Sequence, residues 1–234
     1  MQDGWQQLVY EMQLATARDV AMVLPLPTAE DESPQLEFIS LSEYPDFFRD
    51  LDRCFPAPAP VAVSAAVAAS AGGNVKVIPV GSFNASFLPS QRDFDRLDPR
   101  FRLNRDILAV LPQYARYSFA IFQLRSGEHQ IHPMALRFRT RDSTTLFFPT
   151  LHVHDAAIHE SAHFDHELYA QGGFGADWVR GAHAPRSTMD FGNFLVADRT
   201  RGLVQPDAAV FKGTLFGELP NVDHWVRCFG ERTG

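Results

Sequence analysis

Lysine and cysteine are scarce in this chain of 234 residues, which contains two of each. The lysines are Lys76 and Lys212, so arginine supplies nearly all of the positive charge. This usage fits the codon bias of a GC-rich genome, or a preference for arginine in bidentate contacts with anions. The cysteines, Cys54 and Cys228, lie far apart and form neither a disulfide framework nor a CxxC metal or redox motif. We therefore expect a reducing compartment.

Long apolar runs and an excess of positive charge are also missing. The longest stretch of low polarity, residues 61–73, is rich in alanine and too short to span a bilayer. Residues 1–7 lack the basic and apolar segments of a secretory signal. The formal net charge is −7 and the pI is about 5.7, which disfavours general affinity for nucleic acid. We expect a soluble cytoplasmic protein that binds neither membranes nor nucleic acid.

Alternating apolar residues predict strands in most of the chain. The N-terminal half suggests strands at 5–14, 20–26, 36–39 and 75–87, the last interrupted at Gly81. In the C-terminal half, strands are expected from Tyr117, at 132–138, at 146–153, at 162–168, near Leu195 and at 210–215. The short turns between several of these strands favour an antiparallel meander.

Helical spacing occurs in three short segments. Ser42 is a candidate N-cap for a helix that carries Phe47, Phe48 and Leu51 at intervals of three and four. Ser90 and Asp93 resemble a capping box, and Asn104 precedes a third candidate helix ending at Pro112. Residues 56–74 are rich in proline and alanine and predict a flexible loop.

These patterns predict one α+β domain over residues 1–234, with a mostly antiparallel sheet and two or three short helices. An all-β sandwich with incidental helices is the alternative. The twenty phenylalanines supply bulk for a core of this kind.

Histidine is concentrated in one window of the sequence. Seven of the nine histidines lie between positions 129 and 166, and the densest part reads FPTLHVHDAAIHESAHFDHELY. Neutral imidazole is the commonest nitrogen ligand for zinc and other first-row transition metals. On a strand, His152 and His154 would face the same side, with His166 or Asp165 from a neighbouring strand as a further ligand and His132 assisting. Three protein ligands with water would make a catalytic site, and four a structural one.

The alternative is that these histidines only stabilise the fold. His132 and His166 occupy the same alternating positions as the apolar residues of their expected strands, so each is also a candidate for a buried, hydrogen-bonded histidine. Cupins have an HxH motif followed by a glutamate, but here Glu160 follows His154 by six residues and the preceding glycine is missing. The sequence contains no GxSxG, GxGxxG or Walker motif that would favour another chemistry.

Three segments, VAMVLPLP (20–27), HPMALRF (132–138) and FPTLHVHD (148–155), resemble an uncharacterised family of bacterial proteins. The resemblance covers roughly residues 8–170 and implies no activity, cofactor or partner. It supports a single domain and suggests that the HVHD segment is a family feature.

The sequence leaves three functions open. The first is a non-catalytic binding or interaction protein, which predicts an exposed apolar patch. The second is a metal-binding protein or metal-dependent enzyme that uses the histidines between 152 and 166. The third is a structural component that self-associates through an edge strand.

Overall fold

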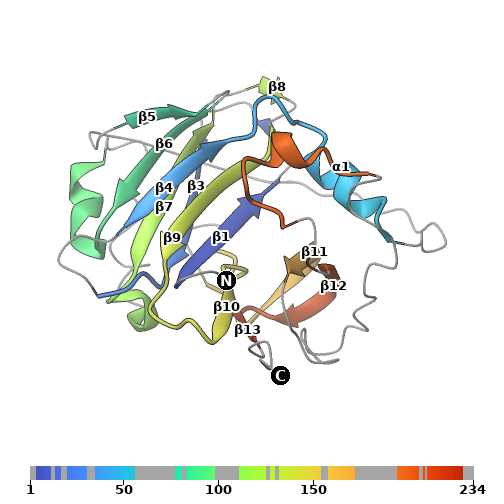
Figure 1. Cartoon of the computed structure of the whole chain (residues 1–234). Coiled ribbons are helices and arrows are strands. Elements are labelled where there is room, and N and C mark those ends of the chain that lie inside the picture. The colour runs from blue at the N-terminus through green and yellow to red at the C-terminus, as the bar shows by residue number, and fades with distance from the viewer. Residues whose placement is uncertain are drawn as a thin grey trace.

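The computed structural model is built mainly from antiparallel strands (Figure 1). Every strand pairing in the part of the chain that it describes is antiparallel. The predicted class, a mostly antiparallel sheet with short helices, is therefore confirmed. The described residues are 4–11, 14–16, 20–30, 35–55, 77–80, 83–97, 111–124, 127–129, 132–153, 158–171, 194–205, 208 and 210–228.

A four-stranded sheet forms one layer, in the order β3 (Val20–Leu26), β7 (Ser118–Leu124), β6 (Phe83–Leu88), β5 (Val77–Val80). Proline occurs in β3 (Pro25) and in β5 (Pro79), the two edge strands. Proline has no amide hydrogen to donate, so an edge is the part of a sheet that tolerates it. The sequence thereby determines which two strands lie outermost.

A three-stranded sheet forms the second layer, in the order β1 (Trp5–Tyr10), β9 (Met134–Arg139), β4 (Leu36–Ser40). The two sheets enclose a core in which Phe122 of β7 meets Phe83 of β6 and Phe38 of β4 edge to face, with ring centroids 5.4 and 5.5 Å apart. Each fully buried phenylalanine removes a large apolar area from water, so the burial of Phe83, Phe122 and Phe138 contributes strongly to the stability of this core.

Helical segments cover the outer faces of both sheets. Helix α1 (Phe47–Asp52) packs Phe47 and Leu51 against Ala135 of β9. The 3-10 turns η1 (Gln91–Arg96) and η3 (Pro112–Tyr114) pack on the four-stranded sheet, through Phe94 and Tyr114. A further 3-10 turn, η5, spans Ala197–Thr200.

Two antiparallel ribbons complete the described part of the fold. The long ribbon joins β11 (Ser161–Gln171) to β12 (Val210–Pro220) along eleven residue pairs. The short one joins β10 (Thr145–Phe148) to β13 (His224–Arg227). They share a core cluster around Phe164, Leu215 and Val226. The strands β2 (Leu14–Thr16) and β8 (Gly127–His129) form a separate short pair.

Several sequence-based expectations need correction. Strands expected from Tyr117, at 132–138, at 146–153 and at 162–168 do not form a meander, because β9 pairs with β1 and β4 while β7 pairs with β3 and β6. Leu195 lies in a bend, not a strand, and α1 has Asp46 as its N-cap in place of Ser42. The capping box of Ser90 and Asp93 is confirmed, although it begins a 3-10 turn.

The expected loop at 56–74 and most of the expected helix after Asn104 lie outside the described residues. Within those residues, no helix is long and apolar enough to cross a membrane.

Candidate functional site

The segment that carries His152 leaves the sheet earlier than its alternating pattern predicts. Strand β10 ends at Phe148, and residues 149–153 belong to no strand. Pro149 follows the last strand residue and cannot donate a ladder hydrogen bond, which explains the end of the strand. The expectation that His152 lies on a strand spanning 146–153 is therefore wrong, and its side chain is oriented by other contacts.

His152 and His166 form a close pair. Their Nε2 atoms are 3.0 Å apart, although the two residues come from different segments. His166 lies on the inner face of β11, in line with the buried Phe164 and Leu168, as the alternation in the sequence predicts. The His152 ring stacks on the Phe164 ring, with centroids 4.5 Å apart and planes at 22°. The pair is thus supported from one side by a completely buried aromatic ring.

Asp165 contacts the far side of the His166 ring. Its Oδ1 lies 3.2 Å from Nδ1 of His166. A carboxylate only accepts hydrogen bonds, so Nδ1 carries the proton and Nε2 of neutral His166 has a free lone pair. His152 then donates from its own Nε2 across the 3.0 Å separation. For a neutral pair, the contacts are satisfied with His166 protonated on Nδ1 and His152 on Nε2, and Asp165 orients the His166 ring.

Asn221 and Asp223 hold the backbone around His152, and Gln6 bonds strand β10 before it ends. The His152 N–H donates to Oδ1 of Asn221 (2.7 Å), and Nδ2 of Asn221 donates to the carbonyl of His152 (2.8 Å). Asp223 accepts from the N–H groups of Thr150 and Leu151 at 3.0 and 3.1 Å. Gln6 bonds both the N–H and the carbonyl of Phe147. These side chains supply the partners that a neighbouring strand would otherwise provide.

His224 lies beside this segment. Its Nδ1 is 2.7 Å from Oγ1 of Thr150, which also lies 2.9 Å from the carbonyl of Val222. Burial and the charge of nearby His166 lower the pKa of His224, which favours its neutral form. Thr150 itself is 1% exposed, so its hydroxyl serves as an anchor and not as an accessible nucleophile.

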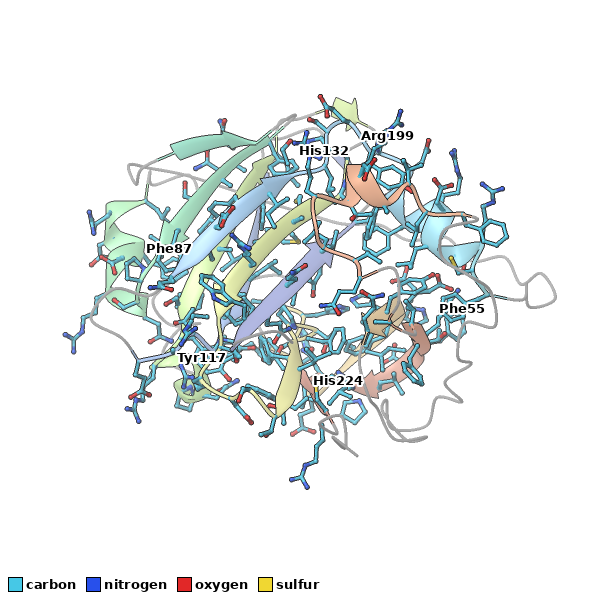
Figure 2. The ribbon with its side chains drawn as sticks, viewed as in Figure 1. Phe55, Phe87, Tyr117, His132, Arg199 and His224 are labelled. Atoms are coloured by element: carbon cyan, nitrogen blue, oxygen red, sulfur yellow. The ribbon has the colours of Figure 1, made fainter. Side chains whose placement is uncertain are left out.

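Of the other predicted ligands, His132 does not join the pair. His154 lies outside the described residues. His132 is buried in the upper part of the molecule, where its ring lies 4.7 Å from that of Phe83, while His224 lies at the opposite end of the view (Figure 2). His132 therefore matches the reading of a buried core histidine.

The residues His159 to His163 match the HExxH pattern of zinc metalloproteases, a signal that the sequence-based prediction above did not use. That pattern works on a helix, where both histidines occupy one face. Here Ser161 begins strand β11, and His163 lies on its outer face, where Nδ1 is 3.6 Å from Glu218. The local structure therefore does not fit a metalloprotease helix.

Asn221, Asp223 and His224 were missed by the sequence reasoning. They belong to the segment NVDH (221–224), which follows β12 and ends on the first residue of β13, and which has no alternation and no known motif. The signal available in the sequence was its density of polar residues directly after the apolar alternation of 210–219. Long-range hydrogen bonds bring this segment to 150–152.

The arrangement provides one imidazole lone pair and one exchangeable proton between two fixed rings. His166 has a side chain that is 29% exposed, so the pair is reachable from solvent. Across the described ranges, no three His, Cys, Asp or Glu side chains converge closely enough to hold a metal ion. An ion bound here would therefore have two imidazole ligands from the described residues and take its other ligands elsewhere.

Asp223 gives this region a predictable pH dependence. Burial raises its pKa, although Tyr114, Leu151 and Thr150 donate hydrogen bonds that oppose the increase. Because the folded-state pKa exceeds the unfolded one, the contribution of Asp223 to stability is complete below its ordinary value of 3.8 and is lost as the pH rises through the folded-state pKa. We expect Asp223→Asn, which cannot ionise, to become progressively more stable relative to the unchanged protein as the pH rises from about 4 to 7. Urea unfolding at four pH values measures this, and a constant difference between the two proteins would contradict it.

Comparisons with known proteins do not identify the chain. No family model matches it, and no curated protein matches it. A chain of the caspase-8/P35 complex has a TM-score of 0.44 and 9% identity over 97% of this chain and 92% of that chain. A mutated baculovirus P35 after caspase cleavage has a TM-score of 0.46 and 10% identity, over 98% and 94%. Similarity at this level supports no statement about the function of this chain, and membership of an uncharacterised bacterial family stays a prediction.

Proposed function

We propose that the protein binds a first-row transition metal ion through Nε2 of His152 and Nε2 of His166. The observation that carries this proposal is the 3.0 Å separation of these two nitrogens, held by groups on different elements. The candidate ions are zinc and its neighbours, because neutral imidazole suits them.

The distance fits two ligands of one ion. With metal–nitrogen bonds of about 2.0–2.1 Å and a tetrahedral angle, two ligand nitrogens are about 3.3 Å apart. To admit an ion, the two nitrogens must move apart by a few tenths of an ångström, both rings must turn so that their lone pairs converge on the ion, and His152 must lose its Nε2 proton. A plain hydrogen bond between the two imidazoles accounts for the same distance, so the test must detect metal directly.

Asp165 supports the metal interpretation more specifically. A histidine that ligates a metal generally donates its other ring N–H to a carboxylate or carbonyl, which fixes the tautomer and raises the basicity of the ligand. The contact between Asp165 Oδ1 and His166 Nδ1 has this arrangement. In this proposal Asp165 orients a ligand and is not itself one.

The two described ligands leave coordination positions for His154 and for water. His154 is proposed from the sequence alone, as the residue two positions beyond His152. Three protein ligands and water would allow metal-assisted hydrolysis or oxidation, whereas four protein ligands would make a structural site. We propose metal binding as the function and metal-dependent catalysis as its extension if a position stays open.

The first prediction concerns metal content. We expect untagged protein purified without chelator to contain about one equivalent of zinc, iron, copper or nickel by mass spectrometry. We expect His152→Ala and His166→Ala each to lose it, because each removes one imidazole ligand. His163→Ala is the matched control, since His163 lies on the same strand but on its outer face. Metal retained by both ligand variants, or absent from the unchanged protein after reconstitution with zinc, would contradict the proposal.

The second prediction concerns Asp165. We expect Asp165→Ala to weaken zinc affinity by about 10- to 100-fold without abolishing binding, because it removes an orienting contact and not a ligand. Competition with a chromophoric chelator measures the affinity. Complete loss would show that Asp165 is a ligand, and no change would show that its contact with His166 is incidental.

A second candidate function is the binding of another protein surface. Its support is three exposed hydrophobic residues in the C-terminal part of the sequence: Phe216 is 54% exposed, Val222 49% and Trp225 43%. Exposed apolar residues of this size mark interaction sites when they are contiguous. The partner would be a different protein, or a second copy of this chain in a self-assembling component.

The double substitution Phe216→Ser with Trp225→Ser tests this candidate. If a second copy covers these residues, light scattering gives a discrete oligomer for the unchanged protein and a monomer for the variant, because the variant removes the apolar contact. If a different protein covers them, a partner retained in pull-downs by the unchanged protein is lost with the variant. Equal mass and equal retention for both proteins would contradict the candidate.

We also propose that the whole chain forms one domain in the cytoplasm. One core cluster joins Val9 and Leu41 from the N-terminal part to Leu195 and Val210 from the C-terminal part. Both cysteines are free thiols, which fits a reducing compartment.

A further inference from the structure

Asn221 is a buried polar residue with an unusual set of partners. It is 6% exposed and follows Pro220, the last residue of β12. Its side-chain amide bonds three backbone groups of the opposite segment: the N–H of His152 (2.7 Å), the carbonyl of His152 (2.8 Å) and the carbonyl of His159 (3.1 Å). Both hydrogens of Nδ2 are used, because one is donated to the carbonyl of His152 and the other to the carbonyl of His159.

These bonds connect both histidines of the pair to one strand. His166 lies on β11 directly opposite Leu215 of β12, in an uninterrupted register that reaches Ser161 and Pro220. His152 is attached to the residue that follows Pro220. The separation of the two Nε2 atoms therefore depends on the pairing of β11 with β12 and on Asn221, the first residue after β12.

We propose that Asn221 is the positioning residue of the metal site: it holds the backbone of His152 so that its Nε2 faces Nε2 of His166. This inference rests on the proposed function for its metal readout, and it has a second readout that needs no metal. Residues 149–153 belong to no strand, so without Asn221 the peptide groups of His152 would lose the partners that fix them. A shift of the backbone by a fraction of an ångström moves the imidazole out of ligand distance.

Gln6 provides a matched control. It is 2% exposed, it is also a side-chain amide, and it bonds both backbone groups of Phe147 in the same segment. Replacing Gln6 by alanine removes the same kind of buried amide–backbone contact five residues before His152. A purely structural role of Asn221 predicts that Asn221→Ala and Gln6→Ala behave alike, whereas a positioning role predicts that only Asn221→Ala changes the histidine pair.

The experiment compares the two variants by cobalt titration and by nitrogen-15 NMR of the histidine rings at one fixed pH. Cobalt(II) serves as the probe because its visible absorption reports nitrogen coordination. We expect Asn221→Ala to weaken cobalt binding by about tenfold or more, the usual size of an effect beyond the ligands themselves. We expect it also to remove, in metal-free protein, the preference of His152 for protonation on Nε2, while His166 stays protonated on Nδ1 beside Asp165. Gln6→Ala is expected to leave both readouts unchanged.

Each outcome decides a separate point. If unchanged protein binds no cobalt but Asn221→Ala alone loses the tautomer pattern, the proposed function fails and the positioning role stands. If Asn221→Ala binds cobalt as tightly as unchanged protein and keeps the tautomers, the positioning role is wrong and the metal site stands. If Asn221→Ala does not fold, the isosteric Asn221→Asp is measured in the same way. It keeps an acceptor for His152 N–H but places an oxygen against two carbonyls, so it is expected to weaken cobalt binding and alter the tautomers as well.

Discussion

The arrangement around the histidine pair depends on how the peptide groups of residues 149–152 find hydrogen-bond partners away from a regular sheet. Buried N–H and C=O groups must be paired, and a segment that leaves its strand at Pro149 lacks a neighbouring backbone to pair with. Side chains replace that neighbour: Asp223 at Thr150 and Leu151, and Asn221 at His152. Each comes from a distant part of the sequence, so this segment is fixed only when the whole fold has formed.

The same requirement explains why two imidazoles lie close together without repelling each other. His166 accepts because Asp165 keeps its proton on Nδ1, and His152 donates because its ring meets that lone pair. Phe164 contacts both rings, which reduces the solvent around them. In such surroundings two neutral imidazoles, or two imidazoles bound to one cation, are more favourable than two charged ones. The metal-free and metal-bound states of the pair would therefore have similar separations of the two Nε2 atoms and differ in the orientation of the rings.

Local patterns predicted the strands and part of the site. Alternation along 162–168 correctly placed His166 on the inner face, next to Phe164, because a period of two is a property of the strand itself. It failed at His152, where Pro149 ends the strand while the apolar residues Leu151 and Val153 continue the pattern. Strand order was not predictable either: β9 pairs with β1, more than a hundred residues earlier, and no short turn marks that pairing. Asn221 and Asp223 act through contacts with residues about seventy positions away, which no local window contains.

The outer face of the long ribbon completes the support of His166. Lys212 of β12 is buried and lies 2.5 Å from Asp52 of α1 and 2.7 Å from Glu167 of β11, and the single Tyr169 hydroxyl lies within hydrogen-bonding distance of both carboxylates. These contacts hold the ribbon against α1. They lie on the face opposite His166, because side chains alternate along β11 and Glu167 and Tyr169 are each an odd number of residues from His166. A compact ammonium fits between two carboxylates here, which explains a lysine in a chain that otherwise uses arginine. Strand β12 thus anchors His166 through its pairing with β11, and anchors His152 through the residue that follows it. The two candidate ligands belong to different segments of the sequence, but they are held by one element of the structure.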